Sequence, residues 1–218
     1  MSAEPTGFLY PFLDGDERDA NTLLVDLAAS AQAKMAESAN LRAATLEGLA
    51  GMLRSAAEDM AHRFHHGGRL YTFGNGGSAT DAEGAADLFR NPPHGRSLPA
   101  MSLVDDQAVL TALANDVGFE LVFSRQVIAH ARPGDIVMGF STSGDSVNVL
   151  HAFEEAARRG LLTVGLSGYE GGAMANAEVV DHCLVVGSVS VHRIQEAQDA
   201  LVFELWSTVQ RCLESVRS

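Results

Sequence analysis

Lysine is almost missing from this sequence: Lys34 is the only one, and arginine fills the rest of the 15 Lys and Arg positions. Schiff-base catalysis needs a reactive lysine, and a P-loop needs one directly after its glycine-rich turn. Lys34 has no such context, so both kinds of site are excluded. The sequence also lacks a basic segment followed by an apolar stretch at its start, and it lacks an apolar run of about 18 residues. We therefore expect no secretion, no membrane contact and a cytoplasmic location.

Cysteine is scarce as well. Cys183 and Cys212 are the only two, both stand in apolar surroundings, and their spacing is unlike that of a C-x-x-C motif. Isolated cysteines of this kind are usually buried thiols with a packing role. We expect two structural thiols, in keeping with a reducing compartment.

Acidic residues outnumber basic ones, 28 Asp and Glu against 15 Lys and Arg, which gives a net charge of -13. Such a surface repels the phosphate backbone of nucleic acids, so we expect no nucleic-acid partner. The 218 residues are 46% hydrophobic, enough for one sizeable domain with additions. We divide the chain into an N-terminal arm (1–16), a helical extension (17–66) that serves subunit contacts, and a main domain (67–218).

Short apolar runs alternate with helical stretches in the main domain, and two amphipathic helices precede it, at about 17–35 and 43–64. The runs predicted as strands are 69–73, 100–104, 135–140, 162–166 and 182–186. Helical periodicity covers about 79–89, 107–114, 119–131, 147–159, 172–177 and 191–216. Alternation of this kind predicts an α/β fold, a three-layer α/β/α sandwich around a five-stranded parallel sheet of flavodoxin-like order.

Two strand ends carry glycine and hydroxyl residues rather than ordinary turn residues: GNGGS at 74–78 and STSGDS at 141–146. In a flavodoxin-like sheet the first and third strands are neighbours, and ligands bind beyond their carboxyl ends. Open amides at a helix start attract anions, and hydroxyls add donors. We expect a phosphate or phosphosugar site there. The alternative is that Ser78, Ser143 or Ser146 only caps a helix.

Five segments of the chain resemble those of one known protein family. The segments FGNGGSATDAEGAADL, LTALANDVGF, GDIVMGFSTSGDSVNVL, LSGYEGG and HRIQEAQ occur in this order. They resemble the sugar isomerase (SIS) domain family, and within it the bacterial phosphoheptose isomerases and their non-enzymatic relatives, the DnaA initiator-associating proteins. The likeness covers most of the chain.

The resemblance implies a set of ligands for a sugar phosphate or a similar small anion. Hydroxyls of the second loop would grip the phosphate, the first loop would line the same crevice, and the glutamine of the R-I-Q-E segment would face it. The residues implied are Asn75, Gly76, Gly77, Ser78, Ser141, Thr142, Ser143, Ser146 and Gln195.

The resemblance also implies which groups are missing. The family isomerases interconvert sedoheptulose 7-phosphate and a heptose 7-phosphate through an enediol, which requires an acid and a base. An alignment without gaps puts Leu88 where they have the glutamate and Phe203 where they have the histidine. Some members hold zinc at four positions, of which only Gln195 keeps a donor here, since Gly84 takes the other histidine position. We therefore expect neither a metal nor another cofactor.

Two functions from different classes follow. One is a phosphosugar-binding protein with a scaffolding or regulatory role, and the missing acid and base favour it. The other is a sugar-phosphate aldose–ketose isomerase with relocated catalytic groups, for which His192 is the first candidate and Glu83, Asp87 and Glu196 are weaker ones. The chain is thus an enzyme only in the second case. The resemblance further implies a homo-oligomer, a tetramer, and leaves any other protein partner unknown.

Overall fold

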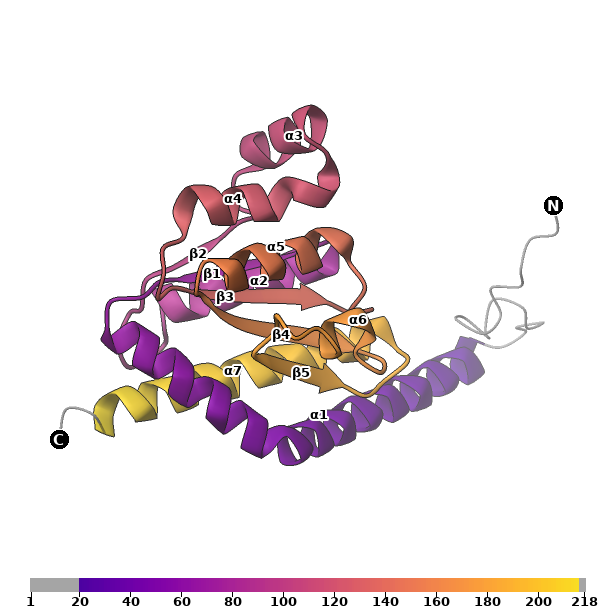
Figure 1. Cartoon of the computed structure of the whole chain (residues 1–218). Helices are drawn as coiled ribbons and strands as arrows, with labels where there is room; N and C mark the ends of the chain where they lie inside the picture. The colour runs from indigo at the N-terminus through magenta and orange to yellow at the C-terminus, as the bar shows by residue number, and fades with distance from the viewer. Residues whose placement is uncertain (1–19, 216–218) are drawn as a thin grey trace. The chain divides into compact units, whose positions relative to one another are not determined.

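The computed structural model describes residues 20–215 (Figure 1). The predicted arm at residues 1–16 lies outside this range. Within it, no helix is both long and apolar enough to cross a membrane.

A five-stranded parallel sheet forms the centre of the main domain, with the order β2-β1-β3-β4-β5. The strands are β1 (Leu70–Gly74), β2 (Ala100–Ser102), β3 (Ile136–Ser141), β4 (Leu162–Gly168) and β5 (His182–Val186). Every residue of β1, β3 and β4 is buried, as strands with helices on both faces require. The predicted fold class and strand order are confirmed.

Helices cover both faces of this sheet (Figure 1). The elements are α1 (Ala20–His65), α2 (Gly77–Arg90), α3 (Gln107–Asp116), the 3-10 turn η3 (Phe119–Leu121), α4 (Val122–His130), α5 (Val147–Arg158), α6 (Gly172–Ala175) and α7 (Val191–Ser215). The second half of α1 shares one core with α2 and α7, around the buried side chains of Trp206, Met60 and Phe89. A second core, on the other face, holds residues of α4 and α5, among them Phe123 and Phe153. The sheet is the middle of three layers.

The N-terminal extension is one helix of 46 residues, not the two helices that its sequence predicts. Compact packing divides the chain between Asn40 and Leu41 rather than after residue 66. The reason is that Leu53, Met60 and Phe64 are buried in the same core as the strands. The second half of the extension is therefore part of the main domain, which differs from the predicted boundary.

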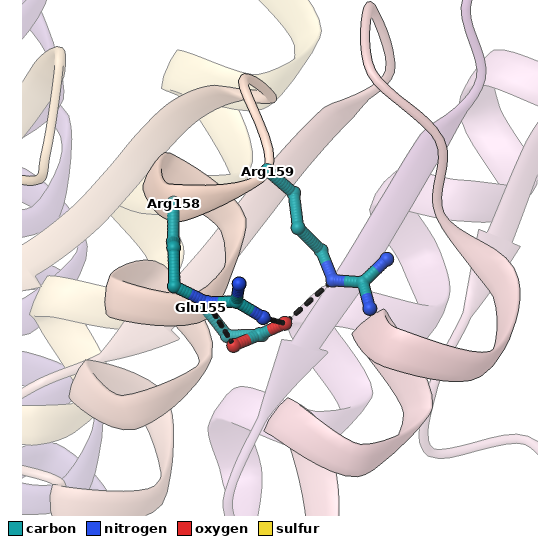
Figure 2. A network of polar contacts seen from close by, with 3 residues as sticks. All are labelled: Glu155, Arg158 and Arg159. Atoms are coloured by element: carbon teal, nitrogen blue, oxygen red, sulfur yellow. Dashed lines mark hydrogen bonds and ion pairs between the residues drawn. The ribbon is translucent and has the colours of Figure 1, made fainter.

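The end of α5 carries a compact ionic group (Figure 2). Glu155 accepts from Arg158 Nε at 3.0 Å and Nη2 at 2.6 Å, and from Arg159 Nε. Hydrogen bonds from Arg158 and Arg159 hold the pKa of Glu155 below its ordinary value, against a smaller opposing effect of burial. Pairs at this spacing stabilise a helix by roughly 0.2–0.5 kcal/mol each, so the group fixes the last turn of α5.

Candidate functional site

The two loops that the sequence singles out lie side by side at the carboxyl edge of the sheet. Strands β1 and β3 pair in parallel, with Gly74 opposite Phe140, so their ends coincide. The Asn75 amide donates to Asn148 Oδ1 at 2.8 Å, and the Asn148 amide donates to Asn75 Oδ1 at 2.9 Å. This reciprocal pair joins the first loop to the first turn of α5. The two loops therefore lie side by side at one edge of the sheet.

The hydroxyls of the second loop form a cluster around Ser141. Its Oγ lies 2.9 Å from Ser146 Oγ and 3.4 Å from Ser143 Oγ, and it accepts from Gly144 N at 3.2 Å. Ser141 is buried, Ser146 is half-buried and Ser143 is exposed. The cluster thus runs from the interior to the surface. It offers donors to an anion without bringing a cation.

Neither helix that starts at these loops has a side-chain cap. Gly76 precedes α2, and Ser146 precedes α5 with a side chain that bonds none of the helix amides, although its carbonyl accepts from Val149 N and Leu150 N at 3.0 Å. By contrast, Asp106 caps α3 by accepting from Val109 N at 3.1 Å. The first amides of a helix have no partner within the helix, and a capping side chain usually accepts from them. In α2 and α5 no side chain accepts from these amides. The alternative that the loop serines only cap helices does not hold for Ser146.

The acidic residue in the second loop is bonded to α6. Asp145 Oδ1 accepts from Ala173 N at 2.8 Å, and Met174 N donates to Gly144 O at 2.9 Å. A Cβ on Gly144 would lie 1.9 Å from Gly171 O, so only glycine permits this approach. Helix α6 and Gly171 before it therefore support the hydroxyl loop, and α6 engages the only carboxylate of that loop.

Gln195, at the start of α7, lies over the first loop. A Cβ on Gly77 would come within 2.4 Å of the Gln195 amide, which shows how closely the two approach. The same amide donates to Asp81 Oδ2 at 3.0 Å across the α2–α7 contact. Three elements, the β1 loop, α2 and α7, thus meet at this point.

Two carboxylates at the contact of α2 and α7 have raised pKa values. Burial raises the pKa of Asp81, the hydrogen bond from Gln195 opposes that rise, and the charge of Asp199 adds to it. Burial, and then the charge of Glu196, raises the pKa of Asp199. Both groups hold protons more readily than ordinary aspartates do. Carboxylates with perturbed pKa values are typical of functional sites.

Other predicted residues have different surroundings. His192 is exposed in the first turn of α7, one turn before Gln195, and Ser78 is buried in the first turn of α2. Leu88 is partly buried and packs against the core, whereas the Phe203 ring is 50% exposed and lies 5.3 Å from the Trp206 ring. The predicted thiols, Cys183 and Cys212, are only partly buried.

The amide of Gln195, which the resemblance puts at one of the family's zinc positions, is engaged with Asp81. Within residues 20–215, no three His, Cys, Asp or Glu side chains are grouped so that they could hold a metal. We derive no chemistry from a metal.

A cavity of about 790 Å³ lies at the opposite edge of the sheet, where the strands begin. Its buried carboxylate, Asp135, accepts from Arg69 N at 2.9 Å and from Arg132 N at 2.8 Å. Asp181, also in its wall, accepts from Thr163 N at 2.9 Å. These bonds fix the strand starts, so we assign the cavity a structural role.

The structure thus brings together the hydroxyls of Ser141, Ser143 and Ser146, and it joins their loop to Asn75. Sequence reasoning missed Asn148 and Asp199. The position of Asp199, four residues after Gln195 on one helix face, is a signal that could have found it. Asn148 gives no such signal, because its pairing depends on how two distant loops meet.

Comparisons with known proteins agree with this geometry. A family model described as the SIS domain matches residues 35–168. A phosphoheptose isomerase of Roseiflexus sp. (strain RS-1) is 42% identical over 180 residues, which are 81% of this chain and 89% of that protein. The solved phosphoheptose isomerase of Neisseria gonorrhoeae superposes with a TM-score of 0.78 at 34% identity, covering 87% of this chain and 99% of that one. For the phosphoheptose isomerase of Francisella tularensis the TM-score is 0.79 at 30% identity, covering 84% and 98%. A family match over more than half of its length and relatives this similar show that the chain belongs to the SIS domain family.

Proposed function

We propose that this protein binds a phosphosugar at the carboxyl edge of its sheet and serves a scaffolding or regulatory role rather than a catalytic one. The phosphate lies against the hydroxyls of Ser141, Thr142, Ser143 and Ser146, and the sugar extends toward Asn75, Gly76, Gly77, Ser78 and Gln195. Relatives named phosphoheptose isomerases make a heptose phosphate the first ligand to test.

One observation carries the proposal. Two helices start uncapped beside a hydroxyl cluster, and the Asn75–Asn148 amide pair joins their loops. The positive end of a helix dipole and a first turn without a side-chain cap favour a doubly charged phosphate. The carboxylate of Asp145 is held by Ala173 N and does not oppose the anion at close range.

Thermal melting with ligand tests the binding. A ligand at 100 times its Kd stabilises the native state by about 2.7 kcal/mol, which for a chain of this size is a rise of about 5–10 °C. We expect this rise with sedoheptulose 7-phosphate. The variant Ser143→Glu should lose it, because a carboxylate would occupy and repel the phosphate position.

A matched control is Ser55→Glu, which adds the same charge on an exposed position of α1. It should keep the full rise in melting temperature. If Ser143→Glu keeps the rise as well, the anion binds elsewhere and the proposal is wrong.

The absence of catalysis is part of the proposal. The resemblance puts Leu88 and Phe203 at the positions of the family's acid and base, and neither side chain can transfer a proton. Zinc and other cofactors have no part in it, since Gln195 is the only donor at the zinc positions.

A second function, an aldose–ketose isomerase, is favoured by Asp81 and Asp199. Their raised pKa values suit one carboxyl to act as the acid and the other, once ionised, to act as the base beside Gln195. Starting from the ketose sedoheptulose 7-phosphate, the carboxylate takes a proton from C1 and the carboxylic acid protonates the carbonyl oxygen O2, which gives the enediol. A proton is then returned to C2 and the O1–H proton is removed, which leaves the aldehyde at C1 and restores both carboxyl groups to their initial protonation states. His192, one turn from Gln195, is the third candidate.

Proton exchange separates the two functions. Sedoheptulose 7-phosphate incubated with the protein in heavy water should keep its C–H protons, as measured by NMR, if the protein only binds. Exchange or turnover above buffer would overturn the non-catalytic role. Its loss in Asp199→Asn, or in His192→Ala, would then identify the group that transfers the proton.

We further place the protein in the cytoplasm as a homo-oligomer, a tetramer as in the family, without nucleic-acid or membrane partners. The free apolar side chains of the first half of α1 support subunit contact.

A further inference from the structure

Tyr169 has a backbone conformation that tyrosine rarely adopts. Its φ is 52°, and within residues 20–215 it is the only residue other than glycine with a positive φ. For a residue with a Cβ the left-handed region costs roughly 1–2 kcal/mol. Strain of this kind persists where the surrounding structure holds it, and it is concentrated at ligand sites.

The surroundings of Tyr169 show what holds it. Gly168 N donates to Thr142 O at 2.9 Å, and Gly171 N donates to Gly168 O at 2.8 Å, which closes a turn around Tyr169. A Cβ on Gly168 would lie 2.5 Å from Ile194 Cδ1 and 2.8 Å from Thr142 O. The turn is therefore held between the hydroxyl loop and the start of α7.

These contacts place Tyr169 at the rim of the candidate site. Its backbone neighbour Gly168 touches Thr142 on one side and Ile194, next to Gln195, on the other. The Tyr169 side chain is 37% exposed, and its hydroxyl has no hydrogen-bond partner in the part of the chain that the structure describes. A packing role inside the fold does not explain an exposed ring at a strained position.

We propose that the Tyr169 ring forms a side wall of the site and packs against the carbohydrate part of the phosphosugar. This inference rests on the proposed function. Aromatic rings are common walls of small-molecule sites, where they offer a large rigid apolar face. The phosphate is bound by the hydroxyl loop, so the ring distinguishes a sugar phosphate from phosphate alone.

Calorimetric titration with two probes, sedoheptulose 7-phosphate and inorganic phosphate, tests whether the Tyr169 ring contacts the sugar. Tyr169→Gly should weaken binding of the sugar phosphate about two- to tenfold, as expected for one ring contact, and leave binding of inorganic phosphate unchanged. Tyr169→Asn should act in the same way, since Asn tolerates positive φ. Tyr169→Phe keeps the ring and should bind both probes as the unaltered protein does.

Stability separates this role from a structural one. Glycine relieves the strain, so the melting temperature of free Tyr169→Gly should not fall. A fall, or unchanged affinity for the sugar phosphate in both the Gly and Asn variants, would overturn the inference while phosphate binding stands. If the unaltered protein binds neither probe, the proposed function fails, and this inference fails with it.

Discussion

The charged forms of Asp199 and Asp81 lower the free energy of unfolding of the protein. Both are partly removed from water, and the charge of Asp199 raises the pKa of Asp81. A carboxyl with a raised pKa binds more protons in the folded than in the unfolded state. Its contribution to the free energy of unfolding is therefore most favourable at low pH and is lost as pH rises through the raised pKa.

The variant Asp199→Asn should accordingly be more stable at pH 7, where the carboxylate is charged. We expect a rise in melting temperature of about 1–2 °C, since changes at partly exposed sites alter stability by roughly 0.5 kcal/mol. The gain should vanish at a pH below the ordinary value for aspartate, because both proteins are then neutral at this position. Melting curves between pH 3 and 8 measure it. A loss of stability at pH 7 would show instead that the Asp199 charge is favourably held.

At the level of residues, the sequence indicates the hydroxyls of the second loop because their type and spacing already suit an anion. It cannot indicate the pairing of Asn75 with Asn148, which lie 73 positions apart. Nor does it show the conformation of Tyr169, because the turn depends on bonds from Gly168 to a different loop.

At the level of elements, three strands end later than their apolar runs predict. Strands β1, β3 and β4 end at Gly74, Ser141 and Gly168. These residues have low strand propensity, yet pairing continues through them, because Gly74 faces Phe140 and Ser141 faces Ser167 in the register. Tertiary pairing thus extends the strands into the loops and brings the polar residues together at the carboxyl edge of the sheet.

For α1 the sequence predicts a break between two helices, and the structure has one continuous helix. The apolar period is interrupted between 36 and 42, a stretch in which Ala36 and Ala39 occur. Alanine has the highest helix propensity, so the backbone continues as helix although the amphipathic pattern lapses. Periodicity reports which face is buried, and it does not report where the helix stops.

At the level of the whole molecule, apolar side chains in the first half of α1 remain exposed. Leu24, Val25 and Met35 are 63%, 66% and 71% exposed. Burial of such side chains contributes roughly 25 cal/mol per Å² of apolar surface, which favours association. The second half of α1 does not need a partner, because Leu53 and Met60 are already buried in the core.

Light scattering at micromolar concentration should therefore give a mass several times that of the 23.1 kDa chain, and four times for a tetramer. The double variant Val25→Glu with Met35→Glu should shift the distribution to smaller species, because it places charges on the exposed apolar positions. Glu37→Gln, a nearby change that removes a charge, should leave the mass unaltered. A monomer in the unaltered protein would contradict the subunit contact.

The paired amides of Asn75 and Asn148 hold the two loops together with groups that carry no charge. Neither group ionises, so acidification and added salt, which weaken ion pairs, leave the spacing between the two loops unchanged. The second ionisation of a phosphate monoester falls near neutral pH. The pH dependence of ligand binding between these two loops therefore comes chiefly from the ionisation state of the phosphate group.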